Sequence, residues 1–94
     1  HTLVIPKTEI DYIFDIDDRL LGEMIVFSKK VAHAIKLAIP CVKVGVSVIG
    51  LEVPHAHIHL IPMNKVDEMN FGRQKLLLSS DEMVSISESI RTKL

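Results

Sequence analysis

The chain has 94 residues, of which 48% are hydrophobic and 24% are charged. These proportions are typical of a globular domain and the length suffices for one, so a disordered tail, a collagen-like chain and a coiled-coil rod are excluded. The 11 basic and 12 acidic residues are interspersed and give a formal net charge of -1. This balance is not the footprint of a nucleic-acid-binding protein, so we expect no nucleic acid as a partner.

Membrane insertion is not indicated either. The longest apolar runs, such as 37–40 and 76–78, are far shorter than the roughly 20 residues that cross a bilayer, so we expect no membrane partner. No leader-like pattern is seen and the single Cys41 has no partner for an internal disulfide, so we expect a reducing, cytoplasmic setting. The chain begins in a strand-like segment without Met, and we expect the natural protein to start further upstream.

The first elements are a short strand and a long helix. Residues 2–5 are β-branched or aliphatic, and the proline that follows ends this strand. From 17 to 38 apolar residues recur every three or four positions, which predicts a helix with Asp15 or Asp17 as its N-cap and Pro40 forcing its end. The expected apolar stripe of this helix consists of Leu20, Met24, Phe27, Val31, Ala34, Ile35 and Ala38.

Two further strands are expected to pair as a hairpin. Residues 41–49 alternate in polarity, residues 50–54 turn the chain, and residues 55–61 alternate again until Pro62 stops them. With so short a connection the two strands most simply run antiparallel. The alternation places Val42, Val44, Val46 and Val48 on one face of the earlier strand.

The C-terminal third predicts a loop and a helix. Residues 63–78 show no clean period and are expected to form a loop. Ser79 or Ser80 caps the helix that follows, and Glu82 stands where a capping box places its acid. The apolar stripe of this helix consists of Met83, Ile86 and Ile90.

The predicted fold class is α+β. Residues 1–94 form a single domain in which an antiparallel sheet carries the 17–38 helix across one face, with a second helix at the C-terminus. The covered face of the sheet is expected to carry Val42, Val44, Ala56, Ile58 and Leu60.

Three of the five histidines, His55, His57 and His59, alternate along the third strand. In a strand such residues share one face, about 6.5 to 7 Å apart, while the apolar residues between them point the other way. Burying an imidazole costs free energy, so packing alone would rarely select three. They therefore indicate a functional surface, whereas His33 on the helix is expected to be a structural or surface residue.

Two chemistries can use such a face. Imidazoles with a pKa near 6.5 can act as nucleophile and as general acid or base at neutral pH. Alternatively, two histidines on one strand can bind Zn²⁺, which needs a third or fourth ligand. The candidates for that ligand are His1, Glu52 and Asp67, and none stands at a recognised spacing, so we expect no metal site.

Three segments of the sequence resemble the motifs of a known family. His55-Ala56-His57-Ile58-His59-Leu60-Ile61 fits the signature of the histidine triad (HIT) family, in which histidines alternate with hydrophobic residues. His1-Thr2-Leu3-Val4-Ile5-Pro6-Lys7 is similar to the upstream strand of that family, and Gly50 and Val53 match its Gly-Gln-x-Val segment. The resemblance covers residues 1–62, and leaves 63–94 as the loop and the C-terminal helix.

The resemblance implies an enzyme, a nucleotidyl hydrolase or transferase acting at the α-phosphate of a nucleoside phosphoramidate or phosphoanhydride. His57 would attack the phosphorus and carry a covalent nucleotidyl intermediate, with a backbone carbonyl near the first histidine accepting a bond from its far nitrogen. His59 would bond phosphate oxygens and assist the leaving group, and His55 would support the strand. The implied substrate-binding residues are His1, Gly50, Leu51, Glu52 and Val53.

The resemblance also implies a purine nucleotide such as AMP as ligand, a homodimer joined edge to edge between sheets, and no required cofactor. Two positions depart from the family: Leu51 replaces a common Gln, and Met63 replaces a common Arg. These departures keep open a nucleotide-binding or partner-binding module with little turnover. A zinc-dependent hydrolase is the further alternative.

Overall fold

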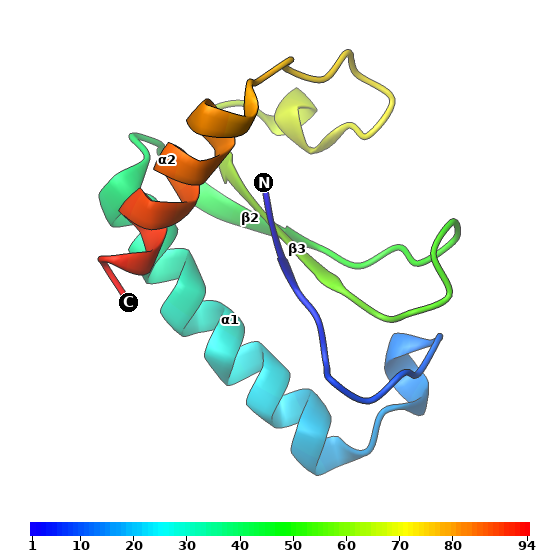
Figure 1. Cartoon of the computed structure of the whole chain (residues 1–94). Helices are drawn as coiled ribbons and strands as arrows, with labels where there is room; N and C mark the ends of the chain where they lie inside the picture. Colours follow the sequence, from blue (N-terminus) through cyan, green and yellow to red (C-terminus); the bar gives the residue numbers. More distant parts are fainter.

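A computed structural model describes all 94 residues as an α+β fold with three strands and two long helices (Figure 1). Two single 3-10 turns, η1 and η2, complete it. In chain order the elements are β1 (Thr2–Val4), η1 (Ile13–Asp15), α1 (Asp18–Ala38), β2 (Lys43–Ser47), β3 (Ile58–Met63), η2 (Val66–Met69) and α2 (Ser80–Arg91). Neither helix has the length and apolar character that a membrane span requires.

The strands form one antiparallel sheet in the order β1-β3-β2, so β3, which carries His59, is central. On one side His59 of β3 lies opposite Leu3 of β1, and on the other it lies opposite Ser47 of β2. The predicted hairpin between the second and third strands is confirmed. The second strand is shorter than the alternation suggested, since β2 covers only Lys43–Ser47 of the expected range 41–49.

The long helix α1 begins and ends where the sequence predicts. The carboxylate of Asp17 accepts a hydrogen bond from the backbone N–H of Leu20 at 2.9 Å, so Asp17 rather than Asp15 is the N-cap. Ile39, which precedes Pro40, has the extended backbone that a following proline favours, and the helix stops there.

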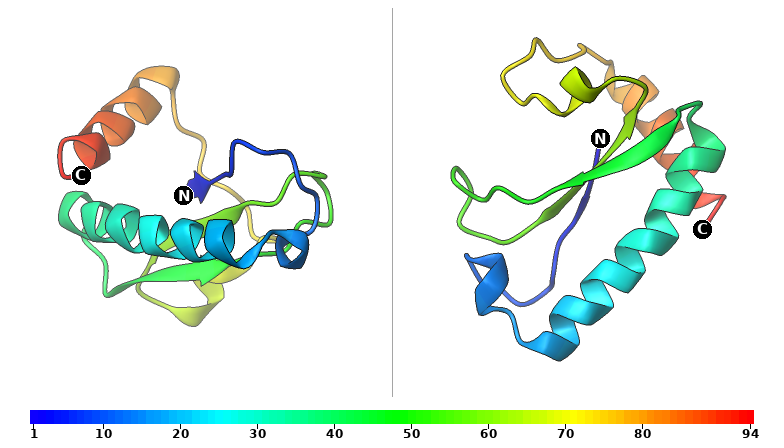
Figure 2. Two further views of the ribbon diagram at one scale, coloured as in Figure 1. Left: turned by 90° about the horizontal axis from the view of Figure 1, so that it is seen from below. Right: turned by 180° about the vertical axis from the view of Figure 1, so that it is seen from behind.

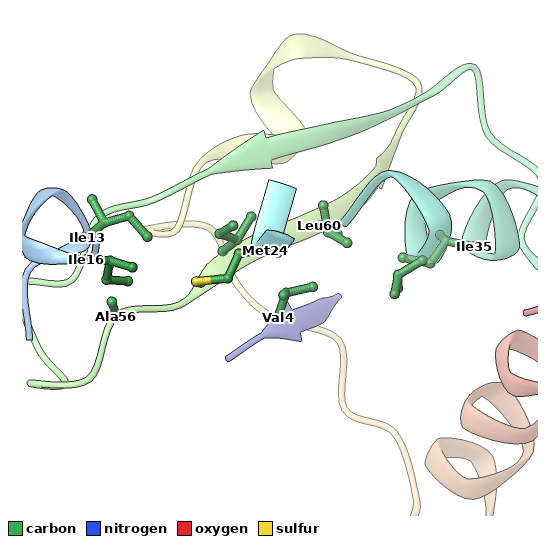
Figure 3. Close-up of a cluster of buried hydrophobic side chains, with 9 residues drawn as sticks. Val4, Ile13, Ile16, Met24, Ile35, Ala56 and Leu60 are labelled. Carbon is green, nitrogen blue, oxygen red and sulfur yellow. The ribbon is translucent and has the colours of Figure 1, made fainter. Parts of the chain in front are cut away.

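The core lies between α1 and one face of the sheet (Figure 3). Ile35 of the helix and Ile58 and Leu60 of β3 are its most completely buried large side chains. Other members close the core at the end where η1 lies, among them Ile13, Ile16 and Ala56. The buried face of β3 is thus fixed by α1, and the opposite face stays uncovered by the helix.

Two residues expected in this core are exposed. Val42 is 62% exposed because it lies in the connection that precedes β2, beyond the covered part of the sheet. Phe27 is 52% exposed because it stands at the border of the apolar stripe, whereas Met24 and Val31 of the same helix are buried. Val44, the other valine expected in the core, does pack against it.

The third strand differs from its predicted range of 55–61. The ladder starts at Ile58, because the last pair with β1 is Val4 with Ile58 and β1 then departs from the sheet. At the other end the strand runs through Pro62 to Met63. The carbonyl of Met63 accepts from Val42 N–H, so by alternation the nitrogen of Pro62 points away from β2. The missing amide hydrogen of Pro62 therefore costs no hydrogen bond between β2 and β3.

The C-terminal part contains a turn that the sequence did not indicate and the helix that it did. The carboxylate of Glu68 in η2 accepts from the backbone N–H groups of Asn64 and Lys65, which winds the start of the expected loop into a 3-10 turn. Ser79, not Ser80, caps α2, with Glu82 bonding back to form a capping box. Figure 2 shows α2 next to the C-terminal end of α1, with which it is in contact.

Candidate active site

The histidines occupy the face of the third strand that α1 leaves uncovered. From 55 to 60 the burial alternates, with each histidine partly buried and each intervening residue (Ala56, Ile58, Leu60) buried. The alternation continues through His55 and His57 although the ladder itself starts at Ile58. The three imidazoles therefore lie on the same side of the chain, as the pattern predicts.

Carbonyl groups of the segment after β1 accept hydrogen bonds from His55 and Ala56, just before the ladder. The N–H of Ala56 donates to the carbonyl of Ile10 at 2.8 Å. The Nε2 of His55 lies 2.9 Å from the carbonyl oxygen of Pro6, and because a carbonyl can only accept, His55 carries its proton on Nε2. His55 thus joins the strand to the chain that leaves β1, which is a supporting position.

A hydrogen bond to the backbone fixes the tautomer of His57. Its Nδ1 lies 2.7 Å from the carbonyl oxygen of His55, so Nδ1 carries the proton and Nε2 keeps its lone pair. This bond matches the carbonyl contact that the resemblance implies. Nε2 has no partner within the chain, and no side-chain nitrogen that lacks a partner is buried. The free nitrogen of His57 is therefore open to solvent.

His59 forms a pair with His1. The Nε2 of His1 and the Nδ1 of His59 are 2.7 Å apart, and the ring of His59 also stands edge-on to that of His57, at 4.7 Å between centroids. In this hydrogen bond one nitrogen must donate and the other must accept. The pair can therefore take up one proton beyond its neutral state. A second proton would put hydrogens on both facing nitrogens and break the bond. Such a pair is suited to hold a single exchangeable proton next to His57.

The surroundings of His59 favour its neutral form. Partial burial lowers the pKa of His59 below its ordinary value, and the neighbouring His57 lowers it further, since two imidazolium ions would repel. His59 remains partly open to solvent, so its imidazole can still exchange a proton with a bound molecule.

Phe71, in the loop between η2 and α2, is a site residue that the sequence analysis missed. Its ring lies against both members of the pair, at 4.7 Å from His59 and 5.8 Å from His1 between ring centroids. Figures 1 and 2 show this loop passing close to the N-terminus of the chain. The one available signal was compositional, because Phe71 is the only aromatic residue of the Phe, Tyr and Trp type after Phe27.

The predicted substrate-binding segment 50–53 leads into the triad. Gly50, Leu51, Glu52 and Val53 belong to the connection that projects beyond β2 and β3 at the end where β3 begins (Figure 1). Gly50 has φ of 71°, a left-handed conformation that glycine adopts readily, so it makes the turn. The side chain of Leu51 is 89% exposed, and the segment reaches the triad through the bond from His55 N–H to the carbonyl of Val53.

The described side chains do not form a metal-binding group. No three His, Cys, Asp or Glu residues lie together in an arrangement that could hold a metal ion. His1 approaches His59, but Glu52 and Asp67 do not complete a ligand set with them. The zinc alternative gains no support from this geometry, and metal analysis of the purified protein remains its test.

Fold and site together define a small α+β protein that carries a hydrogen-bonded group of imidazoles on the open face of its central strand. Comparison with known families agrees: the HIT domain model matches residues 1–66. The chain is also 32% identical over 98 residues to an uncharacterized HIT-like protein of Borreliella burgdorferi, covering 96% of this chain and 70% of that protein. The chain belongs to the HIT family.

Solved structures support the same fold. A histidine triad protein of Sinorhizobium meliloti superposes with a TM-score of 0.85 at 19% identity, covering 98% of this chain and 73% of that one. A histidine triad protein of Bradyrhizobium japonicum gives 0.83 at 23% identity, covering 97% and 72%. At these identities the likeness establishes the fold, and the predicted fold class is thereby confirmed.

Proposed function

We propose that this HIT-family chain is a nucleotidyl hydrolase or transferase that acts at the α-phosphate of a nucleoside phosphoramidate or phosphoanhydride, with a purine nucleotide such as AMP as the transferred group. The observation that carries the proposal is the state of His57. Its Nδ1 is bonded to the carbonyl of His55, and its Nε2 is free and open to solvent. An imidazole held in this way is ready to attack an electrophile.

The proposed reaction has two steps. In the first, the lone pair on His57 Nε2 attacks the α-phosphorus, the bond from phosphorus to the leaving nitrogen or oxygen breaks, and the His1–His59 pair supplies a proton to the leaving group. In the second, water gives up a proton to the pair and attacks the phosphorus, and the bond from phosphorus to His57 Nε2 breaks, which releases the nucleotide and returns the lone pair to His57. A transferase replaces the water with another acceptor.

No cofactor is needed for this chemistry, which is also part of the proposal. Protonated imidazoles and backbone N–H groups can stabilise the charge that develops on the phosphate oxygens. Activity that persists unchanged after dialysis against a chelator is the expected result. Loss of activity on chelation, restored by Zn²⁺, would instead favour the zinc alternative.

A fluorogenic adenosine phosphoramidate tests the proposed function. We expect the parent to release the fluorophore and His57→Ala to lose at least about a thousandfold in kcat, because the covalent route is closed. His33→Ala is the matched control, since it removes an exposed imidazole from α1 far from the site, and its rate should equal that of the parent. Equal rates in parent and His57→Ala would end the claim for a covalent histidine.

Two features favour a second candidate, a nucleotide-binding module with little turnover. Leu51 presents an exposed aliphatic side chain where the family commonly has Gln. Met63, which replaces a common Arg, packs its sulfur against Gly45 of β2 and offers no charge to a phosphate chain. Calorimetry that detects AMP binding, together with no cleavage of any substrate tried, would establish this candidate in place of the enzyme.

We further propose a homodimer. The strand β2 is an edge of the sheet, and its Val46 is 58% exposed. Pairing of two β2 edges across a two-fold axis would satisfy the unpaired backbone groups of this edge and would bring the two copies of Val46 toward the interface. Light scattering should give about twice the chain mass of 10.5 kDa, and a mass near 10.5 kDa would contradict the dimer.

A further inference from the structure

The loop that links η2 to α2 is exposed except at one residue. Over 70–80 every residue is exposed apart from Phe71. Its neighbours Leu76 and Leu77 are 86% and 94% exposed, so apolar character alone does not bury a side chain in this loop. The ring of Phe71 is partly buried and lies against the pair of imidazoles, His1 and His59.

A compact turn presents the ring. The N–H of Arg73 donates to the carbonyl of Asn70 at 3.2 Å, and the N–H of Gly72 donates to the side-chain oxygen of Asn70 at 2.9 Å. The ion pair between Arg73 and Asp67, at 3.7 Å, connects the turn to η2. Phe71 lies within this turn, so the position of its ring is set by local bonds as well as by its contact with the imidazoles.

The Phe71 ring faces the His1–His59 pair, which has few titratable or charged neighbours. Leu3 and Ser47 flank His59 across the two neighbouring strands, and neither titrates. The titratable groups near His59 are His57 and the His1 imidazole. On the loop, the charges of Arg73 and Asp67 are directed at each other. Phe71 places an uncharged ring against both imidazoles.

We propose that Phe71 is a positioning residue of the site: its ring closes one side of the His1–His59 pair and holds the two imidazoles in the hydrogen-bonded arrangement that shares a single proton. The ring contacts are offset and tilted, at 58° to His59 and 53° to His1, which are geometries that aromatic rings favour. The effect on catalysis rests on the proposed function, whereas the effect on the pair does not.

Removing the ring admits water to the pair. Partial burial is the larger cause that lowers the pKa of His59, so the pKa should rise toward its ordinary value once the ring is gone. The bond between the imidazoles should also become less persistent, because water competes for both nitrogens.

Nitrogen-detected NMR of the histidine rings in the full chain tests this inference. In Phe71→Ala we expect the titration of His59 to move to higher pH than in the parent, and the signals of His33 serve as an internal reference. Phe71→Tyr keeps the ring and should titrate as the parent does. Leu77→Ala is the matched control, because it removes an exposed apolar side chain from the same loop.

Kinetics provide a second measurement. If the pair supplies a proton, Phe71→Ala should lower kcat by about ten- to a hundredfold with little change in KM and should move the pH profile in the same direction as the titration. Should this variant fail to fold, Phe71→Leu keeps an apolar side chain and is expected to show a smaller shift of the same sign.

An identical His59 titration in Phe71→Ala and the parent overturns the inference, whether or not the protein is active. A shifted titration in a protein without turnover upholds it while the proposed function fails. The two outcomes are therefore distinguishable.

Discussion

Replacing Leu60 with alanine tests how firmly the core behind the histidines supports the site. Leu60 is fully buried in β3, on the side of the strand opposite His59. Leu60→Ala removes three buried carbon atoms, worth about 2.4 kcal/mol at ~0.8 kcal/mol each. The cavity left behind adds to this loss, so we expect about 3 kcal/mol less free energy of unfolding, within the usual range of about 2–5 kcal/mol for such a substitution.

That loss is large for a domain of this size. Domains of 94 residues unfold with roughly 5–14 kcal/mol, so about 3 kcal/mol is between a fifth and more than half of the total. The melting temperature should fall by roughly 12–24 °C. Urea denaturation at one fixed protein concentration measures the difference, which keeps any contribution from association constant.

The control for Leu60→Ala is Leu77→Ala, which removes the same atoms from a 94% exposed side chain and should change the free energy of unfolding by less than about 0.5 kcal/mol. A loss below about 1 kcal/mol in Leu60→Ala would refute the reasoning, since a leucine at the centre of this core could not then be packed as described.

Two further predictions concern the C-terminal part. Ser79→Ala should lower the free energy of unfolding by about 1 kcal/mol, because it removes the capping bond to Glu82 N–H, and thermal melting should show the loss. Hydrogen bonds from Asn64 and Lys65 hold the pKa of Glu68 below its ordinary value, so its stabilising effect is complete above about pH 4.3 and fades as the pH falls through the lowered pKa. The stability difference between the parent and Glu68→Gln should therefore shrink on acidification, and an unchanged difference at pH 3 would contradict this account.

The sequence alone predicted the features that depend on near neighbours. The alternation at His55, His57 and His59 places the imidazoles on one face, because side-chain direction in extended chain is a property of the backbone itself. The cap at Asp17 and the capping box at Ser79 are likewise local, each linking residues three apart.

What could not be predicted depends on distant segments. Phe71 contacts His59 only because the loop after η2 turns back over the sheet, and nothing in the loop's own residues indicates that path. The exposure of Val42 depends on how far α1 extends over the sheet. Pro62 was expected to end the strand, and it does not, because its nitrogen faces away from β2, with which β3 continues to pair through Met63.

The placement of Pro62 has a consequence for the pairing of the central strand. Its nitrogen points to the flank of β3 opposite β2, and a proline nitrogen carries no hydrogen. A strand that pairs with β3 on that flank receives no backbone hydrogen bond at this position, so the ladder there is interrupted at Pro62. The residue that departs from the usual strand pattern thereby makes the two flanks of β3 unequal, because only the flank toward β2 can form a continuous ladder.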